Sequence, residues 1–215
     1  MNITILCSSE NHPINPWLDK WMARHSNKHS VNLSRSKKEL IGGDILFLIS
    51  CSEIVTSDER QGYNNTLVIH ASDLPKGRGW SPHVWEIIND KSEITLSLLE
   101  AADKVDSGDI WKKTKIFIPK TDLFDQINER IFGAELELMD FAIMNYGSIK
   151  IVKQDTQVKP TYYKKRSQQD SEIDINESIG SQFNLIRICD PERYPAFFYY
   201  NGQRYNFYIE TSDDD

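Results

Sequence analysis

Hydrophobic and polar positions in the first half of the chain alternate between short apolar runs and helix-like stretches. Apolar runs typical of strands cover residues 2–7, 30–33, 44–50, 66–70, 93–99 and 115–118. Helical spacing covers residues 16–24, 36–41 and 81–89. Because strands that alternate with helices favour parallel pairing, we predict an α/β protein with a Rossmann-like, open and mostly parallel sheet.

The second half of the chain begins with its longest helical pattern, which spans residues 123–146. An apolar run at residues 149–152 predicts one more strand. Residues 154–182 are polar, and residues 183–210 end in two alternating aromatic runs around Asn201-Gly202, a dipeptide typical of tight hairpins. We therefore predict a main domain over residues 1–150 and a C-terminal extension over residues 151–215 with a small helix, a β-hairpin and an acidic tail.

The loops of this sheet contain a candidate site. Ligands of open α/β sheets bind beyond the carboxyl ends of the strands, and we expect four loops to leave from that edge, at residues 8–16, 50–55, 71–82 and 100–109. His70 ends an apolar run and opens into the third loop, a position suited to proton transfer. The fourth loop carries Asp103, Asp106 and Asp109, so a carboxylate can meet His70 if the two strands are neighbours. On spacing alone, a core histidine and a solvated acidic turn explain these residues equally well.

The residues that follow His70 make the pattern specific. The signature loop of the folate-dependent formyltransferases resembles the set His70, Ser72, Leu74, Pro75, Arg78, Gly79 and Pro82. That family's Leu-Asp-Thr-Gly-Asp segment is similar to Val105-Asp106-Ser107-Gly108-Asp109. The resemblance implies the formyltransferase fold, with residues 1–150 as the catalytic domain, and 10-formyltetrahydrofolate as the donor of a formyl group to an amine. It also places His70 and Asp106 on two members of the family's Asn-His-Asp catalytic set.

The third member of that set is missing, because Val68 stands where the family has its asparagine. A valine side chain cannot donate a hydrogen bond to an oxyanion. Either another donor takes this role, or the site relies on His70 and backbone amides. Asn64 and Asn65 are close in sequence, but we expect the intervening strand to carry them to its far end.

The resemblance also suggests the acceptor. Residues 162–166, 184–187 and 194–197 resemble the end of the catalytic region in sugar-nucleotide and methionyl-tRNA formyltransferases, although a solvated basic turn and a helix start would also explain the first two segments. The loop 70–82 and the chain length most resemble sugar formyltransferases of pseudaminic-acid-type pathways. That likeness implies a UDP-linked 4-amino-4,6-dideoxy-N-acetylhexosamine as acceptor. A tRNA enzyme would continue into a basic domain, whereas this sequence ends in Asp213-Asp214-Asp215.

Further residues are expected to bind the two substrates. The resemblance places the pterin of the folate against two segments, Ser52, Glu53, Ile54 and Val55, and Ala102, Asp103, Lys104 and Val105. We expect Arg78 to bind the acceptor's pyrophosphate, because a guanidinium fork fits phosphate oxygens, with Lys76 as second candidate. Trp80 would either stack on the base or fill the core. Ser81 and His12 complete the predicted acceptor site.

Composition excludes several classes of function. The net charge of −7 argues against a nucleic-acid partner, which calls for a basic face. No apolar run approaches the roughly 20 residues of a membrane span, and the N-terminus lacks a signal peptide, so we expect a cytoplasmic protein without a membrane partner. The three cysteines are scattered, and neither a metal site nor a dinucleotide or triphosphate motif is present.

Two alternatives to formyl transfer stay open. With Val68 in place of the asparagine, the chain could be a folate-binding protein that lacks transferase activity, or it could release formate from the folate as a deformylase. The presence of both His70 and Asp106 favours the transferase. The aromatic residues between 194 and 205 could contact the sugar nucleotide, and core packing or a homodimer contact would explain them equally well.

Overall fold

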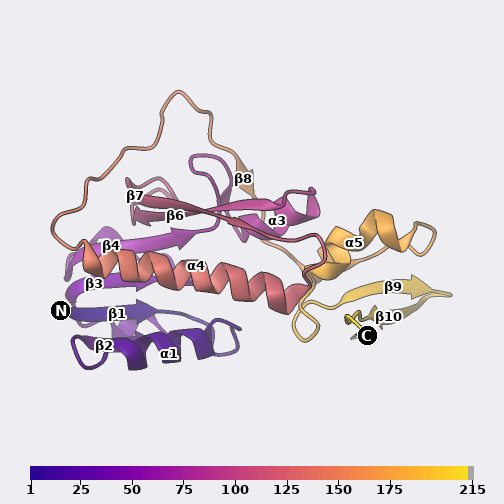
Figure 1. Cartoon of the computed structure of the whole chain (residues 1–215), viewed down its shortest axis with the longest axis horizontal. Helices are drawn as coiled ribbons and strands as arrows, with labels where there is room; N and C mark the ends of the chain where they lie inside the picture. Colours follow the sequence, from indigo (N-terminus) through magenta and orange to yellow (C-terminus); the bar gives the residue numbers. More distant parts are fainter. Residues whose placement is uncertain (213–215) are drawn as a thin grey trace.

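The central feature of the fold is a sheet with four parallel strands. A computed structural model describes residues 1–212, and the predicted acidic tail at residues 213–215 lies outside the described residues. Within them, one sheet has the strand order β2-β1-β3-β4-β6-β7 (Figure 1). Its strands are β1 (Asn2–Leu6), β2 (Ser30–Ser34), β3 (Gly43–Leu48), β4 (Tyr63–His70), β6 (Glu93–Glu100) and β7 (Ile110–Phe117). Because β2, β1, β3 and β4 pair in parallel, the predicted Rossmann-like sheet is confirmed.

The strand β6 reverses direction. It pairs antiparallel with β4 and with β7, so that Ser97 lies beside His70 and Glu100 beside Leu67. The prediction that the loop 100–109 leaves from the carboxyl edge of the parallel strands is therefore wrong, since an antiparallel strand ends toward the opposite edge. The loop between β6 and β7 nevertheless turns back toward the end of β4, since Asp106 of this loop lies 3.6 Å from His70.

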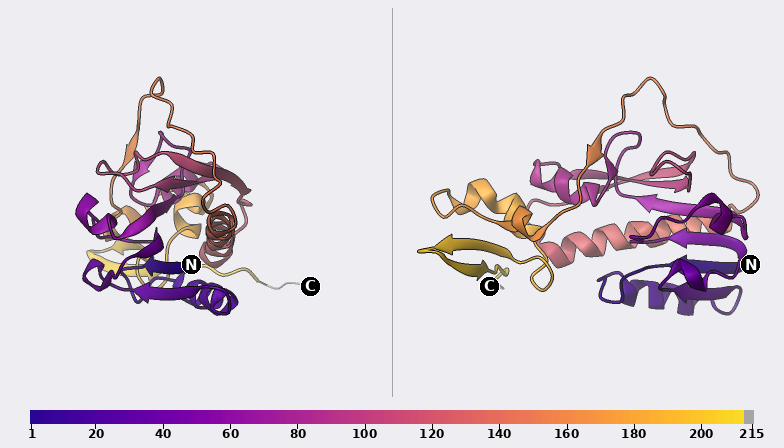
Figure 2. Two further views of the ribbon diagram at one scale, coloured as in Figure 1. Left: turned by 90° about the vertical axis from the view of Figure 1, so that its left-hand side faces the viewer. Right: turned by 180° about the vertical axis from the view of Figure 1, so that it is seen from behind.

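Two helices cover one face of the sheet. They are α1 (Asn15–His25) and α4 (Phe124–Met144), which pack over the main hydrophobic core (Figures 1 and 2). Trp21 of α1 is fully buried, and its Nε1 donates to Asp140 Oδ1 of α4 at 2.6 Å. The predicted helices at 16–24 and 123–146 are thus confirmed within two residues at each end, because an apolar stripe that faces a sheet leaves a clear period in the sequence.

Shorter elements cover the opposite face. The predicted helix at 36–41 is a single 3-10 turn, η1 (Lys37–Glu39). The four-residue helix α2 (Ser57–Arg60) was not predicted, although Thr56 and Glu59 form a capping box at its start. A small cluster of Leu6, Leu46, Val55 and Tyr63 lies beneath these elements.

The helix α3 (Pro82–Ile88) connects β4 to β6 and agrees with the predicted helix. After α4 the chain runs back across the molecule (Figure 1), and the strand predicted at 149–152 is absent, because Val152 alone forms a bridge there, with Ile110. The strand β8 (Tyr162–Tyr163) then pairs with β5 (Arg78–Gly79). We call residues 152–163 the strap.

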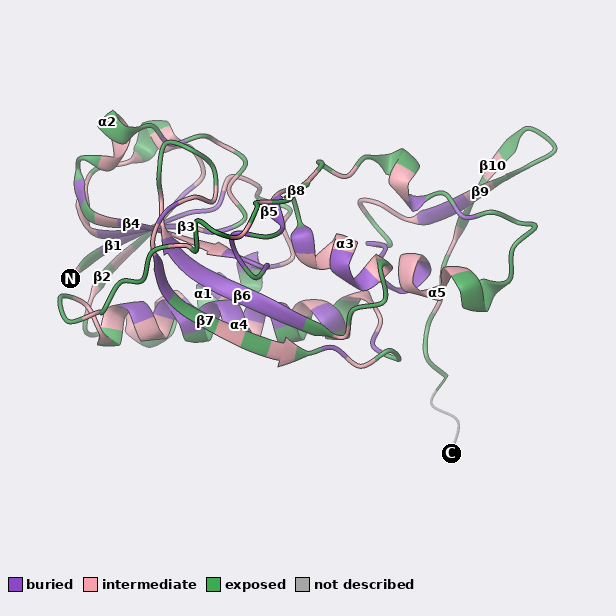
Figure 3. Ribbon diagram, turned by 90° about the horizontal axis from the view of Figure 1, so that it is seen from above, coloured by how far each residue is buried: buried purple, intermediate pink, exposed green. Residues whose placement is uncertain are grey.

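The C-terminal part contains a helix and a hairpin, as predicted. Its elements are η2 (Gln168–Ser171), α5 (Ile179–Arg187), β9 (Ala196–Tyr200) and β10 (Gln203–Phe207). Asn201 and Gly202 both have positive φ, 48° and 79°, as a two-residue hairpin turn requires. The tip of the hairpin projects into solvent (Figure 3). The division of the chain at residue 150 stays a prediction.

None of the helices within residues 1–212 combines the length and the apolar character that crossing a bilayer requires.

Candidate active site

His70 and Asp106 meet at the end of β4. The distance from His70 Nδ1 to Asp106 Oδ1 is 3.6 Å, and the two side chains are 8% and 7% exposed. The second carboxylate oxygen of Asp106 accepts a hydrogen bond from the backbone N–H of Gly79 at 2.8 Å. The structure therefore brings together the two residues that the sequence places in a catalytic pair.

The other nitrogen of His70 is also engaged. Its Nε2 lies 2.8 Å from the carbonyl oxygen of Gly77. Because a carbonyl can only accept, Nε2 carries a proton in this arrangement. Both ring nitrogens thus face oxygens, which fixes the plane of the ring and aims Nδ1 at Asp106. An imidazole and a carboxylate placed in this way can exchange a proton.

The alternation of β4 explains why His70 lies on this face of the sheet. Leu67 and Ile69 point into the main core beneath α1 and α4. Val68 points the other way and packs in an apolar cluster with Leu74, Leu99 and Ile110. His70 shares the face of Val68, since alternate residues of a strand point to the same side. At the far end of β4, Asn64 is bonded to Asp44 and Tyr146, so the expectation that the strand carries Asn64 away is confirmed.

The strap holds the signature loop over this face. The N–H of Gly77 donates to Thr161 Oγ1 at 2.8 Å, and the N–H of Arg78 donates to the Thr161 carbonyl at 2.9 Å. Gly79 has a φ of 98°, and a Cβ at this position would lie 2.5 Å from the carbonyl oxygen of Tyr163. Only glycine fits such a close approach at this φ, so the strap and the loop are matched to each other.

Arg78 lies inside the protein. It is 5% exposed, and its guanidinium donates to Gln154 Oε1 at 2.7 Å and to the Tyr162 hydroxyl at 3.5 Å. Gln154, which the sequence analysis missed, also donates to the carbonyls of Asp106 and Gly108. A single glutamine in a polar segment gives no sequence signal of such a role.

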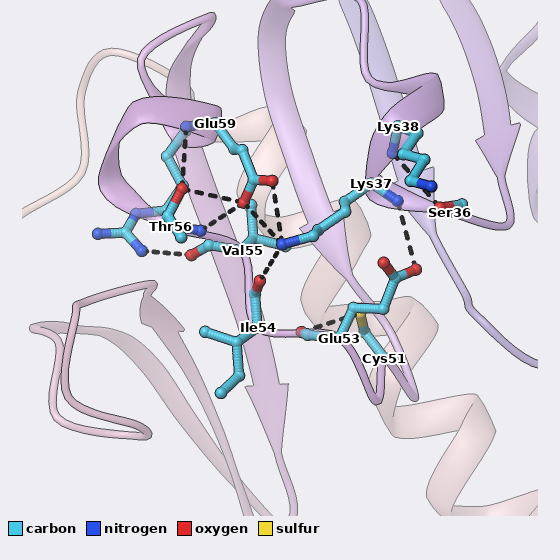
Figure 4. A network of polar contacts seen from close by, with 10 residues as sticks. Ser36, Lys37, Lys38, Cys51, Glu53, Ile54, Val55, Thr56 and Glu59 are labelled. Atoms are coloured by element: carbon cyan, nitrogen blue, oxygen red, sulfur yellow. Dashed lines mark hydrogen bonds and ion pairs between the residues drawn. The ribbon is translucent and has the colours of Figure 1, made fainter.

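The two segments predicted to bind the pterin lie side by side. Arg60 joins them, because it donates to the Val55 carbonyl and to Asp103 Oδ1, both at 2.6 Å. Lys37 supports the first segment, since its ammonium group donates to the Ile54 carbonyl at 3.1 Å and pairs with Glu59 at 3.0 Å (Figure 4). Neither cation was predicted from the sequence.

Each of the two segments carries an exposed apolar side chain. Ile54 of the first segment is 70% exposed, and Val105 of the second is 52% exposed. Ser52 anchors the first segment to the β1 side of the sheet, because its N–H donates to Ser8 Oγ at 2.9 Å. A flat, partly apolar ligand would meet such side chains together with a backbone that Arg60 and Lys37 hold in place.

The residues predicted for the acceptor are more dispersed. Trp80 is 41% exposed, and the ammonium group of Lys165 lies 4.6 Å from its ring centroid. Lys76 is exposed on the same loop. Ser81 is exposed with a positive φ of 43°. His12 packs against Phe132, with ring centroids 5.9 Å apart.

Three titratable groups have strongly shifted pKa values, and two of them, His83 and Glu135, have no role predicted from the sequence. Burial, together with the nearby Arg193, lowers the pKa of His12 to about 4. Burial and the neighbouring His70 and His12 lower the pKa of His83 to about 4, and its Nδ1 has no partner among residues 1–212. Burial raises the pKa of Glu135 on α4 to about 8. At neutral pH all three side chains are therefore uncharged.

Comparisons with known proteins agree on one family. A family model described as formyl transferase matches residues 3–143. The curated methionyl-tRNA formyltransferase of Coxiella burnetii (strain RSA 331 / Henzerling II) is 26% identical over 186 residues, which is 85% of this chain and 59% of that protein. The chain thus spans under two thirds of that relative's length.

Solved structures show the same fold. Methionyl-tRNA formyltransferase from Clostridium thermocellum superimposes with a TM-score of 0.82 at 22% identity, over 99% of this chain and 94% of that chain. A sugar N-formyltransferase from a Shewanella species superimposes with a TM-score of 0.72 at 15% identity, over 100% of this chain and 99% of that chain. The predicted fold class is confirmed by these superpositions.

Proposed function

Because the chain belongs to the formyl transferase family, we propose that it transfers a formyl group from 10-formyltetrahydrofolate to the amino group of a nucleotide-linked amino sugar. The family match over residues 3–143 includes the signature loop. The observation that carries the proposal is the 3.6 Å approach of His70 Nδ1 to Asp106 Oδ1, both buried beside that loop. Proton transfer is the chemistry that such a pair supports.

The reaction requires one proton to move. As the amine nitrogen bonds to the formyl carbon it must lose a proton, and the folate nitrogen must gain one as its bond to that carbon breaks. We assign Asp106 to accept the proton of the amine and to pass it to His70 Nδ1, which faces the carboxylate. The proton on His70 Nε2 then goes to the folate nitrogen as its bond to the formyl carbon breaks. The oxyanion needs a donor that Val68 cannot supply. The Nε2–H of His70 donates a hydrogen bond to this oxyanion once the substrate oxygen replaces the Gly77 carbonyl as its acceptor.

The junction of residues 52–55 and 102–105 fits the folate. The exposed side chains of Ile54 and Val105 offer apolar contacts for the flat pterin ring. Arg60 and Lys37 fix the carbonyls of this segment, and a fixed backbone can read the donor and acceptor groups of the pterin edge without an ordering cost. When bound, the folate supplies the activated formyl group.

Trp80, Lys165 and Lys76 are the residues we propose for the nucleotide. An exposed indole with an ammonium group beside it can stack on a base and attract phosphate oxygens. The inward position of Arg78 leaves the pyrophosphate to the two lysines. The net charge of −7 favours such a small anion over a large polyanion, and the Shewanella structure is a sugar N-formyltransferase. A UDP-linked 4-amino-4,6-dideoxy-N-acetylhexosamine is the acceptor that we would test first.

The test is product analysis with a panel of acceptors. Purified protein is incubated with 10-formyltetrahydrofolate and UDP- or dTDP-linked 4-amino sugars, with methionyl-tRNA, or with no acceptor, and the products are analysed by mass spectrometry. An N-formyl sugar supports the proposal. Formyl-methionyl-tRNA alone, free formate alone, or folate binding without turnover would each replace it by a different function, namely a tRNA enzyme, a deformylase or a binding protein.

A further inference from the structure

Gln154 of the strap connects the loop of Asp106 to Arg78. Its Nε2 donates to the Asp106 carbonyl at 2.8 Å and to the Gly108 carbonyl at 2.9 Å. Its Oε1 accepts from the guanidinium of Arg78 at 2.7 Å. The Arg78 side chain is buried, so its charge adds strength to a hydrogen bond that water does not contest.

The three contacts require a glutamine in one orientation. A guanidinium can only donate and a carbonyl can only accept, so the amide oxygen must face Arg78 and the amide nitrogen must face the loop. A glutamate of the same size at position 154 would keep the contact with Arg78. It would, however, place an anionic oxygen against the carbonyls of Asp106 and Gly108.

The loop that carries Asp106 needs such support. Asp106 has a φ of 52°, a left-handed conformation that is uncommon outside glycine and that Asp tolerates better than most residues. A Cβ at Gly108 would lie 1.8 Å from the carbonyl oxygen of Glu100, so the loop passes tightly against the end of β6. Gln154 binds the carbonyl of the left-handed residue itself, and the direction of the Asp106 side chain depends on that backbone conformation.

We infer that Gln154, oriented by Arg78, is a positioning residue that holds the carboxylate of Asp106 against His70. Arg78 then acts through Gln154 on the catalytic pair and does not bind the pyrophosphate. The kinetic consequence rests on the proposed function. The structural consequence, the position of the Asp106 carboxylate, is independent of the proposed function. The Gly79 N–H donates to Asp106 Oδ2 and therefore reports that position directly.

The experiment compares Gln154→Glu with Gln157→Glu. Both residues lie on the strap and both changes add one negative charge, but Gln157 is exposed. Gln154→Met, of similar length without polar groups, is the second variant. Amide hydrogen exchange at Gly79, kcat, both KM values and the melting temperature are measured. We expect Gly79 exchange to rise at least tenfold and kcat to fall at least tenfold in both Gln154 variants, with KM within threefold and Gln157→Glu like the wild type.

Three results would overturn the inference. The first is wild-type Gly79 exchange with unchanged kcat in both Gln154 variants, and the second is a rise in KM at constant kcat, which would assign Gln154 to substrate binding. The third is faster exchange throughout the protein with a lower melting temperature, which would make its role purely structural. If the wild type transfers no formyl group at all, the proposed function fails, and Gly79 exchange still decides the inference.

Discussion

His70 and Asp106 each form a shorter contact with a backbone group than with each other. His70 Nε2 and the Gly77 carbonyl are 2.8 Å apart, as are Asp106 Oδ2 and the Gly79 nitrogen, whereas the two side chains are separated by 3.6 Å. Each side chain is therefore positioned by its own backbone contact. Replacing one of the two residues should therefore leave the other in place. Single substitutions can then report on the chemistry of each side chain.

His70→Asn and Asp106→Asn should each lower kcat by a factor of about 100 or more, because positioned proton-transfer groups contribute roughly 10²–10⁴ in rate. An asparagine at 106 keeps an oxygen that can accept from the Gly79 N–H, so the loop should persist. Steady-state kinetics and thermal unfolding measure the two effects. Activity within a few-fold of the wild type, in either variant, would remove that residue from the mechanism.

Val68→Asn should bring no gain in activity. Val68 is partly buried against Leu74, Leu99 and Ile110, and an amide among these apolar side chains would lose part of its hydration at a cost of up to about 1–3 kcal/mol. The readouts are formyl-transfer kinetics and urea unfolding, with Val68→Thr as a smaller polar control. A tenfold or larger increase in kcat for Val68→Asn would show instead that the wild-type site is impaired by loss of the asparagine.

At the scale of elements, α2 and η1 should matter for the folate although neither contacts the catalytic pair. Arg60→Met and Lys37→Met remove the donors that hold the Val55 and Ile54 carbonyls. Each should raise the Kd for tetrahydrofolate about three- to tenfold, since one such hydrogen bond contributes about 1 kcal/mol.

Lys38→Met is the matched control, because Lys38 is the exposed neighbour of Lys37 in the same turn. Its effect on the Kd for tetrahydrofolate, measured by calorimetry, should be within the error of the wild type. Kd values equal to that of the wild type in all three variants would place the folate away from the junction of residues 52–55 and 102–105. An equally raised Kd in all three variants would point to general destabilisation.

The direction of β6 shows what the apolar pattern predicts and what it omits. Burial makes apolar residues recur along the sequence, and this pattern predicts the positions of the six strands. The pattern is the same for a parallel and an antiparallel strand, so it does not predict the direction of a strand. The length of α3 does contain that information. Seven residues of helix span about 10 Å, whereas β4 has eight residues at about 3.3 Å each. Such a helix cannot return along β4, so β6 must start near the edge where β4 ends.

The sequence predicts a residue of the candidate site only where the residue type itself indicates its chemical role. His70 and Asp106 stand in a loop and a segment whose residue types are specific. Gln154 was not predictable, because it binds carbonyl groups 48 and 46 positions earlier, and a carbonyl is the same in every residue. Arg78 was assigned to phosphate from its residue type, and its burial against Gln154 could not be known from the sequence.

At the scale of the whole molecule, the three buried titratable groups should set the pH dependence of stability. His12 and His83 have pKa values of about 4 in the folded protein against an ordinary 6.5. The unfolded chain therefore binds two more protons between these values, and stability falls as pH falls from 6.5 toward 4. Glu135 has a pKa of about 8 against an ordinary 4.5, so the folded protein keeps a proton that the unfolded chain loses, and stability falls as pH rises from 4.5 to 8.

The sum of these effects predicts a maximum of stability near pH 6.5. Between pH 4.5 and 6.5 the two histidines bind two protons more in the unfolded chain and Glu135 one fewer, so these groups should raise the free energy of unfolding by roughly 1 kcal/mol per pH unit. Above pH 6.5 Glu135 should make it decline. Urea unfolding at pH 5, 6.5 and 8 measures both limbs. Glu135→Gln keeps the shape of the side chain and should remove the loss of stability above pH 6.5. The loss of stability below pH 6.5, which comes from the histidines, should remain. If this variant still loses stability above pH 6.5 as the wild type does, ionisation of Glu135 is not the cause of that decline.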